Sequence, residues 1–484
     1  MDLVLAIDQG TTSTKALLVG PCGEIVAAGN CPVGIVNRRP GWFEQDGQAI
    51  WDSVTTAVGR CLQAGPETRP VALAISNQRE SVAAWDRSTG APLGPVLGWQ
   101  DARTATRAAE LAAGGAGAEV RRLTGLPLSP MFSALKIRWL LDSLGSIGLR
   151  RAVAGTLDAY LVHRLTGGQV TATDGSNASR TLLCRLDPVG WDSDLLRLFG
   201  VPEDVLPSIR PSNGDFGVTR PSGPLPGGIP IRAVLGDSHA ALFGHGIEPG
   251  EAKVTYGTGS SVMKLTAAPE SGPASVSTTV AWLLDRPVYA REGNILATGA
   301  AVDTVARLLG MADAAALAAL ARNVDQSPLT LVPAFSGLGS PHWDPRAVGL
   351  IAGLGRDARP EQLAYAAIDA VAQQVCDVLD AMESGGEEIG ALLADGGATV
   401  NAQLMQLQAD LAGRPVAAAA TPELSALGAA AMAWRGLGAP PRPRPQGTVY
   451  QPQEDAAWRD ARRSQWTQAL SRSRGMNRKD GAER

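Results

Sequence analysis

The sequence predicts an α/β fold built from two similar lobes, and three observations support this prediction. A short apolar run, a stretch with helical periodicity and a second apolar run follow one another near the start of the chain. Similar apolar and amphipathic segments recur in the later half. Turns rich in glycine, threonine and serine follow a strand-like run near residue 10 and again near residue 257. With 484 residues, of which 45% are hydrophobic, the chain is long enough for two or three well-packed domains.

The first half begins with a buried strand. Residues 3–7 are apolar and lie between two aspartates, which is typical of a strand covered on both faces. A helix is expected over 50–62, where apolar residues recur at helical spacing, and Gly65-Pro66 ends it. Residues 71–75 form the next expected strand, which ends in the polar cluster 76–80. The order strand, helix, strand indicates an α/β lobe.

The second half has the same kinds of segment. Residues 231–235 predict a strand that ends at Gly236-Asp237, and 361–383 predict a long amphipathic helix. A further strand is expected over 392–394, with another helix from about Gln403. Two proline-rich stretches, 221–230 and 438–447, predict surface loops, and the polar tail 473–484 is expected to fray.

Two turns repeat each other across the chain. Gly10-Thr11-Thr12-Ser13 and Gly257-Thr258-Gly259-Ser260 each lie between a strand-like run and another mostly apolar run. They predict two matching β-hairpins and a duplicated architecture. Such turns suit phosphate, because their N–H groups converge and their hydroxyls add donors, although each alone is also compatible with an ordinary tight turn. No P-loop motif occurs in the sequence.

A third glycine cluster, Asp395-Gly396-Gly397-Ala398, stands between a strand and a helix. The N-terminus of that helix could face phosphate or ribose, or the cluster could simply connect the two elements. Asp8 and Asp237 each stand at the end of an expected strand. Carboxylates in that position are candidates for Mg²⁺ ligands or for a general base, or they are ordinary turn residues. Arg79-Glu80 offers a cation and an anion to a polyhydroxyl ligand, or forms a solvated charge pair.

Composition excludes several classes of protein. The net charge is −4, which gives no electrostatic footprint for nucleic acid or an anionic membrane. No run of 18 apolar residues occurs, and the N-terminus lacks the basic region of a secretory signal. Five scattered cysteines without a CxxC motif predict reduced, buried thiols in a cytoplasmic protein.

Several motifs taken together resemble those of the FGGY carbohydrate kinases. They are 8–15, 76–80, 98–103, 177–181, Gly236-Asp237, 256–259, 333–355 and 395–398, in the family's order over roughly residues 1–435. Asn77-Gln78-Arg79-Glu80 and the segment 333–339 are similar to the glycerol kinase branch.

This resemblance implies two ribonuclease-H-like lobes of the actin and hexokinase type, with an interlobe cleft. It implies an N-terminal substrate-binding lobe over 1–245 and a C-terminal nucleotide-binding lobe over 246–440. Residues 441–484 are then an extension with one helix and a frayed tail. The implied cofactors are ATP and Mg²⁺, and the implied partners are a small polyol or sugar and further copies of the chain, as a dimer or tetramer.

The resemblance also assigns roles to residues. Asp237 matches the catalytic base, and Asp8 together with Asp237 matches the site near Mg²⁺ and the transferred phosphate. The residues that match nucleotide-binding positions are Thr11, Thr12, Ser13, Lys15, Gly257, Thr258, Gly299, Asp303, Gly397, Ala398 and Asn401. Lys15 stands where many glycerol kinases carry arginine, and Asp303 stands where they usually carry glutamine.

The substrate positions match only in part. Arg79, Glu80 and Trp99 match residues that contact substrate in glycerol kinases. The three that depart are Met131, Ser238 and Ser261, where glycerol kinases usually carry tyrosine, glutamine and phenylalanine. Loss of two hydrogen bonds, at about 0.5–1.5 kcal/mol each, would weaken glycerol binding. Both serines are expected to enlarge the pocket and to leave small hydroxyls that face it, which would suit a longer polyol or a ketose.

The expected activity is therefore ATP-dependent conversion of glycerol to glycerol 3-phosphate. The alternative is a kinase for a longer polyol or ketose of the erythritol, xylitol, xylulose or ribulose type. An actin-like or chaperone-like ATP-driven protein and a sugar-sensing regulator are the alternatives from other classes.

Overall fold

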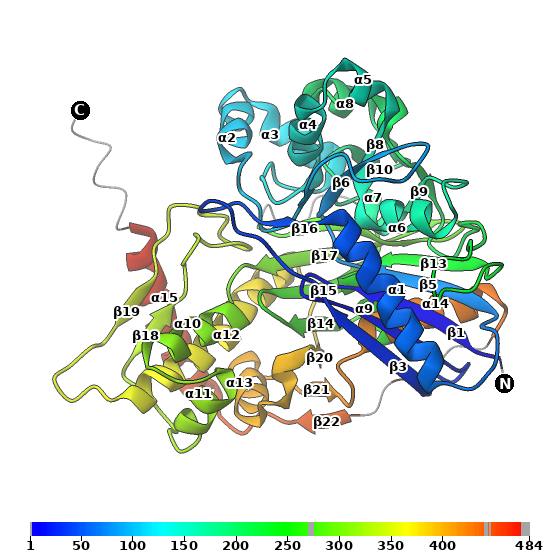
Figure 1. Cartoon of the computed structure of the whole chain (residues 1–484). Helices are drawn as coiled ribbons and strands as arrows, with labels where there is room; N and C mark the ends of the chain where they lie inside the picture. Colours follow the sequence, from blue (N-terminus) through cyan, green and yellow to red (C-terminus); the bar gives the residue numbers. More distant parts are fainter. Residues whose placement is uncertain (1, 270–274, 440–443, 445–446, 476–484) are drawn as a thin grey trace.

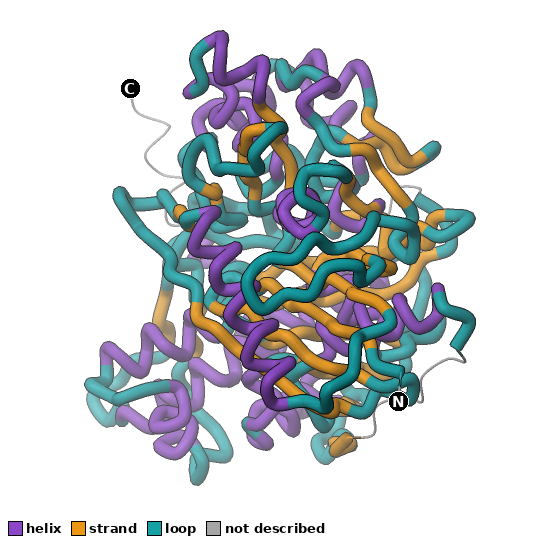
Figure 2. The backbone as a smooth tube through the Cα atoms, turned by 45° about the vertical axis from the view of Figure 1, so that its right-hand side comes forward, coloured by secondary structure: helices purple, strands orange, loops and turns teal. Residues whose placement is uncertain are grey.

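The computed structural model describes residues 2–269, 275–439, 444 and 447–475. Two large β-sheets form its centre, and helices pack between and around them (Figure 1). Figure 2 shows the strands of the first sheet running side by side beneath the long helix α1 (Gly47–Ala64). The side chain of Asp46 caps that helix by accepting from the N–H groups of Gln48 and Ala49.

The first sheet has the strand order β13-β5-β1-β2-β3. The strands are β1 (Val4–Gln9), β2 (Ser13–Val19), β3 (Ile25–Pro32), β5 (Ala72–Asn77) and β13 (Ile231–Gly236). β1 and β2 form an antiparallel hairpin, whereas β1, β5 and β13 run parallel. The carboxyl ends of three parallel strands therefore meet at one edge of the sheet, which is where ligands bind in open α/β sheets.

The second sheet repeats this topology. Its strands are β14 (Glu251–Tyr256), β15 (Ser260–Thr266), β16 (Ser277–Leu283), β17 (Pro287–Ile295), β20 (Ala391–Asp395), β21 (Val416–Ala419) and β22 (Gly447–Tyr450). The run β17-β15-β14-β20-β21 has the same antiparallel and parallel pairings as β3-β2-β1-β5-β13. The two predicted hairpins and the duplicated architecture are confirmed.

Two helices lie between the sheets. α9 (Asp237–Gly244) follows β13, and α14 (Leu424–Gly436) contacts α9, β1, β5 and β13. One apolar cluster joins Ala6 of the first sheet to Met263 of the second through these helices. A Cβ on Gly428 would clash with the carbonyl oxygen of Ala240, so the close approach of α9 and α14 requires glycine there.

A smaller four-stranded sheet extends the first lobe. Its strands are β4 (Glu44–Gln45), β6 (Val82–Asp86), β7 (Val96–Leu97) and β8 (Ala152–Thr156), in the order β4-β7-β6-β8. The helices around the first lobe are α2 (Ala105–Ala113), α3 (Ala116–Thr124), α4 (Ser133–Ser143), α5 (Ser146–Arg151), α6 (Leu157–Leu165), α7 (Gly175–Ala178) and α8 (Ser193–Phe199). The short strands β9 (Ala172–Asp174), β10 (Cys184–Leu186), β11 (Val189–Trp191) and β12 (Ser208–Arg210) complete it.

The second lobe carries the long helices predicted from the sequence. α12 (Pro360–Glu383) and α13 (Ala402–Ala412) begin one residue before the expected positions. The other elements are α10 (Gly299–Leu308), α11 (Ala314–Ala321), α15 (Ala456–Gly475), β18 (Thr330–Val332) and β19 (Leu350–Ala352). α15 packs on this lobe through the buried indole of Trp466, which donates to Asp377 at 2.9 Å.

Some expectations about the surface are wrong, and others concern residues that the structure does not describe. The tail does not fray from residue 473, because Ser473 is buried in α15 and its hydroxyl donates to Val348 O at 2.6 Å. Residues 476–484, and 440–443 and 445–446 of the expected loop, lie outside the described residues. Cys22 is exposed and Cys31 is half-buried, so only three of the five free thiols are buried as expected. No described helix is long and apolar enough to cross a membrane.

Candidate active site

Two aspartates stand at the edge where the parallel strands of the first sheet end. Asp8 is near the end of β1, and Asp237 is the first residue of α9, directly after β13. The hydroxyl of Ser76, which is paired with Asp8 in the parallel register, donates to Asp8 Oδ1 at 2.8 Å. Burial raises the pKa of Asp8 to about 6, and the neighbouring charge of Asp237 adds to this rise.

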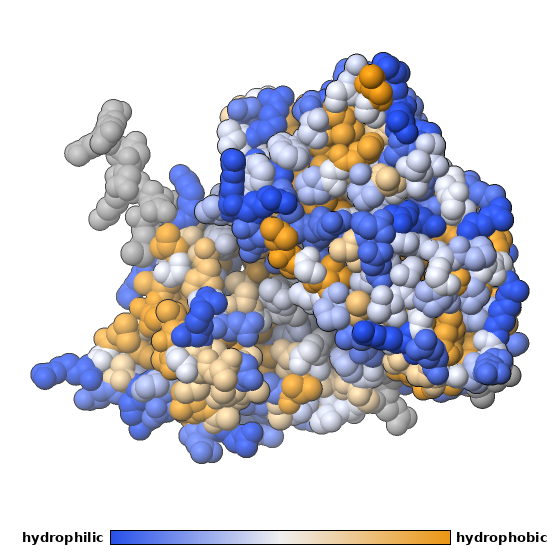
Figure 3. Space-filling view, viewed as in Figure 1, coloured by the Kyte–Doolittle hydropathy of each residue, from blue (hydrophilic) through white to orange (hydrophobic). Residues whose placement is uncertain are grey.

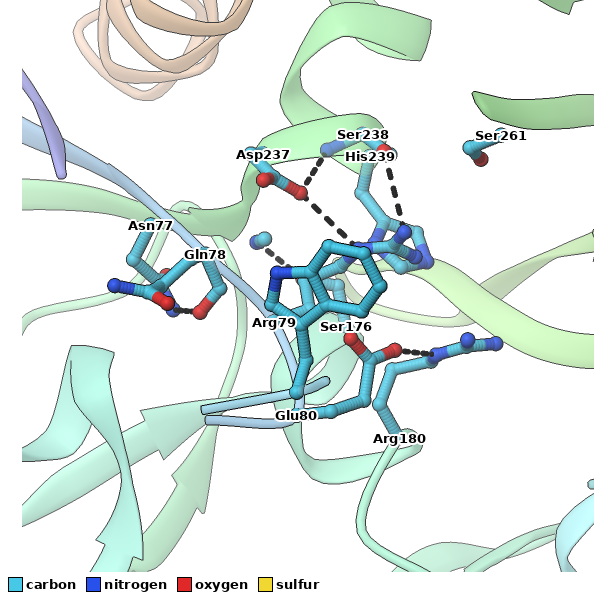
Figure 4. A network of polar contacts seen from close by, with 12 residues as sticks. Asn77, Gln78, Arg79, Glu80, Ser176, Arg180, Asp237, Ser238, His239 and Ser261 are labelled. Atoms are coloured by element: carbon cyan, nitrogen blue, oxygen red, sulfur yellow. Dashed lines mark hydrogen bonds and ion pairs between the residues drawn. The ribbon is translucent and has the colours of Figure 1, made fainter. Parts of the chain in front are cut away.

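Asp237 is held by two donors, and its side chain stays 36% exposed. Arg79 Nε donates to Asp237 Oδ1 at 3.1 Å, and the backbone N–H of Ser238 donates to the same oxygen at 2.6 Å (Figure 4). Burial raises the pKa of Asp237, and Arg79 opposes the rise. A fixed carboxylate whose pKa is moved toward neutrality is suited to accept a proton from a hydroxyl.

Glu80 and Trp99 lie beside this pair. Glu80 has φ of 59°, a left-handed conformation that is uncommon for a non-glycine residue and concentrates at functional sites. Its Oε1 accepts from Arg180 Nε at 2.5 Å (Figure 4). The indole N–H of Trp99 donates to Thr11 Oγ1 at 3.2 Å. The expected substrate wall is therefore bonded directly to the first Gly/Thr/Ser hairpin.

The three positions that depart from the glycerol kinase pattern have different surroundings. Met131 is 9% exposed and belongs to the apolar cluster of the four-stranded sheet. The hydroxyl of Ser238 accepts from Arg79 Nη2 at 3.2 Å. The hydroxyl of Ser261 donates to Glu292 Oε1 at 2.7 Å. Both serine hydroxyls are thus bonded to buried charged groups. Ser261 uses its O–H to donate to Glu292, whereas Ser238 acts as an acceptor toward Arg79 and keeps its O–H as a donor.

The first hairpin combines a turn with a charge. Thr11 and Thr12 lie in the turn between β1 and β2, and Ser13 begins β2. Lys15 pairs with Asp8 across the hairpin. Its Nζ lies 2.9 Å from each carboxylate oxygen of Glu423, the N-cap residue of α14. A cation is therefore held near Asp8 by a residue that comes from the second half of the chain.

The second hairpin meets two further glycine turns. Gly257 and Thr258 connect β14 and β15, and Gly299 N at the start of α10 donates to Gly257 O at 3.0 Å. A Cβ on Gly299 would lie 2.6 Å from that oxygen, and a Cβ on Gly396 would clash with Tyr256 O. Backbone groups alone can approach this closely, which suits a phosphate or ribose cradle.

The remaining nucleotide candidates stand on these same segments. Asp303 is exposed one turn along α10 from Gly299, and Gly397 and Ala398 lie in the 3₁₀ turn Gly397–Val400. Asn401 caps α13, because its Oδ1 accepts from Leu404 N at 3.2 Å.

The structure brings Glu292 and Arg180 into the site, and no individual role was expected for either from the sequence. Glu292 of β17 is fully buried and pairs with both Arg79 and Arg180. Although burial opposes the effect, these two arginines hold the pKa of Glu292 well below its usual value. The signal in the sequence that could have pointed to Glu292 is a carboxylate in the middle of a partly apolar strand, β17.

The residues present fit Mg²⁺ bound together with a nucleotide. The described residues contain no cluster of three or more His, Cys, Asp or Glu that could hold a metal ion alone. Mg²⁺ keeps several waters and takes only one or two carboxylates when phosphate oxygens supply further ligands. Asp8 and Asp237, next to the first hairpin, provide such a donor set.

This combination defines a class of protein. The structure has two sheets of the actin and hexokinase type, each with a Gly/Thr/Ser hairpin, and a carboxylate at the end of β13. These features together define an ATP-dependent alcohol kinase.

Comparisons with known proteins agree. The N-terminal domain of the FGGY family of carbohydrate kinases matches residues 3–244, and the C-terminal domain matches 252–437. The chain is 43% identical to an apulose kinase of Pectobacterium atrosepticum, over 90% of each chain, and 41% identical to a glycerol kinase of Alkalilimnicola ehrlichii, over 99% and 100%. The structure of Plasmodium falciparum glycerol kinase with ADP superposes with a TM-score of 0.89 at 29% identity, over 98% of each chain.

The chain belongs to the FGGY family of carbohydrate kinases. The expected family, the two-lobed fold and the ATP-dependent kinase class are confirmed.

Proposed function

We propose that the protein transfers the γ-phosphoryl group of ATP to a hydroxyl of a small polyol, with glycerol as the first candidate and glycerol 3-phosphate as its product. The observation that carries this proposal is the placement of Asp237 beside Arg79, at the same edge of the first sheet as the first hairpin. Retention of Arg79, Glu80 and Trp99 supports glycerol, as does the 41% identity to a glycerol kinase over nearly the whole chain.

In the proposed mechanism, Asp237 accepts the proton of the acceptor hydroxyl while that oxygen attacks the γ-phosphorus in line. General-base assistance of this kind contributes about 10²–10⁴-fold to the rate. Arg79 keeps the carboxylate aimed and ionised through its Nε contact at 3.1 Å. Trp99 and Glu80 hold the carbon chain and its hydroxyls, which lowers the entropic part of the barrier.

Lys15 and the N–H groups of both hairpins neutralise charge on the phosphoryl oxygens. Asp8 and Asp237 would hold Mg²⁺, which supplies further charge neutralisation when it is bound with ATP. The glycine turns around Gly257 and Gly299 let the backbone approach the nucleotide closely.

A second candidate is a kinase for a four- or five-carbon polyol or ketose. Met131, Ser238 and Ser261 replace residues that bond or enclose glycerol, and both serines are smaller than the residues they replace. The Ser261 hydroxyl already donates to Glu292, whereas Ser238 only accepts from Arg79. The two serines therefore add space at both positions and an available hydroxyl donor at Ser238 alone. The 43% identity to an apulose kinase supports this candidate.

A coupled assay of ADP release separates the candidates. Glycerol, erythritol, threitol, xylitol, ribitol, xylulose and ribulose are compared at saturating Mg-ATP by their kcat/KM. Glycerol in first place supports the first candidate, and a longer substrate that wins by more than about tenfold supports the second. ADP release that no acceptor stimulates contradicts both and favours an ATP-driven conformational protein.

A further inference from the structure

Glu292 connects the two lobes inside the candidate site. It lies on β17 of the second lobe and has no exposed surface. Its Oε2 lies 2.9 Å from Arg79 Nη1 and 2.8 Å from Arg180 Nη1. Its Oε1 accepts from Arg79 Nη2 at 2.7 Å, Ser261 Oγ at 2.7 Å and Asn294 Nδ2 at 2.9 Å. One carboxylate therefore accepts four hydrogen bonds and forms a further ion pair with Arg180, and these partners come from both lobes.

Arg79 is fixed by this carboxylate. A guanidinium has five N–H groups. Two of them form the two-point pair with Glu292, one goes to Ser238 Oγ at 3.2 Å, and Nε goes to Asp237 Oδ1. Two-point pairing fixes the plane as well as the position of a guanidinium. The Nε contact with Asp237 thus depends on Glu292.

Ser238 and Ser261 bind opposite ends of the same ion pair. Ser238 belongs to α9 of the first lobe and accepts from Arg79, whereas Ser261 belongs to β15 of the second lobe and donates to Glu292 (Figure 4 shows both). Phenylalanine at position 261 could donate no such bond. The two serines are far apart in the sequence, yet each changes the same Arg79–Glu292 contact.

We propose that Glu292 is a positioning residue that holds Arg79 against the Asp237 carboxylate, and that Ser238 and Ser261 influence substrate choice jointly through the Arg79–Glu292 pair. This inference rests on the proposed function and extends it, because it assigns two specificity positions to one physical unit. Residues joined by a common network show non-additive effects, whereas distant residues without shared partners add.

A double-mutant cycle tests the joint effect. S238Q, S261F and the double variant are compared with the wild type by the ratio of kcat/KM for glycerol to that for the best longer substrate. The change in the double variant should differ from the product of the single changes by more than about fivefold. The matched control pairs S261F with M131Y, which lies in a separate apolar cluster, and its changes should multiply within about twofold. Multiplicative behaviour of S238Q with S261F overturns the proposal.

Glu292→Gln and Ser261→Ala test the positioning role. E292Q should lower kcat/KM for the acceptor by about 100-fold and change KM for ATP by less than about threefold. S261A leaves the ion pair in place and should lower the same quantity by about threefold. Its effect should be smaller in the E292Q background, because glutamine keeps an acceptor oxygen but loses the ion pair with Arg79. Equal losses for acceptor and ATP, or an S261A effect that is undiminished in E292Q, contradict the proposal.

The proposed function and the inference about Glu292 can fail independently of each other. If the wild type phosphorylates neither glycerol nor a longer acceptor, the proposed function fails. The contacts exist without substrate, so the S261A and E292Q cycle is then measured by thermal unfolding. Additive changes in Tm overturn the inference, and non-additive changes support it.

Discussion

The two hairpins have the same topology and different chemistry. In the first, Lys15 is bonded to Glu423, and Thr11 accepts from Trp99. In the second, uncharged groups meet, because Gly299 N and the hydroxyl of Thr298 both donate to Gly257 O. Under the proposed function, the first hairpin would supply side-chain charge to the reaction, while the second would let the backbone approach the nucleotide closely. The same duplicated sheet would then support two functions because different residues follow the matching strands.

This difference has a consequence for substitutions. Changes to charged groups around the first sheet should lower kcat, because those groups act on the transferring phosphoryl group. Changes that add bulk at the second hairpin should raise KM for ATP instead. Figure 3 shows that hydrophobic residues are more prominent over the second lobe, at the lower left of this view, whereas strongly hydrophilic residues are more prominent over the first lobe.

The largest expected effect is at Asp237. Asp237→Asn keeps the shape of the side chain and removes the proton acceptor, so kcat should fall by about 10²–10⁴-fold. ADP release measured with saturating acceptor and Mg-ATP checks this. Asp194→Asn, an equivalent change at an exposed position of α8 to which no role is assigned, is the control. A loss of less than about tenfold in D237N would remove Asp237 from the base role.

The next effect is at Lys15. Lys15→Met should lower kcat by about 10²-fold, because a cation near the phosphoryl oxygens is lost. Glu423→Gln leaves Lys15 in place and should cost much less than K15M. Steady-state kinetics of both variants give the comparison. If E423Q is as impaired as K15M, the ion pair matters for structure and Lys15 does not act on phosphate.

A smaller effect is expected at the second hairpin. Gly299→Ala places a Cβ 2.6 Å from Gly257 O, so α10 must shift and KM for ATP should rise by about tenfold. KM for the acceptor should change little. Gly117→Ala, whose Cβ meets open space, is the matched control. A rise in acceptor KM instead of ATP KM would contradict the division of roles between the hairpins.

The smallest effect concerns the wall of the acceptor pocket. Lys136 is fully buried and donates to Gly98 O at 3.0 Å and Met131 O at 2.7 Å, and burial lowers its pKa to about 7. Lys136→Met should raise acceptor KM by roughly fivefold, because both backbone segments lose a donor. An isothermal titration with the preferred acceptor checks the change, and unaltered affinity would refute it.

Much of this arrangement is predictable from the sequence. Strand ends are local signals, so the residue pattern alone locates Asp8, Asp237 and both hairpin turns. The glycine clusters are also evident in the sequence. The close approach of the turns at Gly299 and Gly396 to the second hairpin follows from the repeated topology.

The rest depends on packing between distant segments. Glu292 is one of two adjacent charged residues in β17. Its position in the site follows only from the packing of β17 against Arg79 and Arg180. For the same reason, the sequence suggests that the hydroxyls of Ser238 and Ser261 face the pocket, whereas the structure bonds them to that ion pair.

The most direct test of the proposed function identifies the product. The wild type and D237N are incubated with Mg-ATP and glycerol, and separately with the best longer acceptor, and the mixtures are analysed by ³¹P NMR and mass spectrometry. The account predicts one equivalent of acceptor monophosphate for each ADP formed by the wild type and almost none from D237N. Formation of ADP and inorganic phosphate without a phosphorylated acceptor would contradict it.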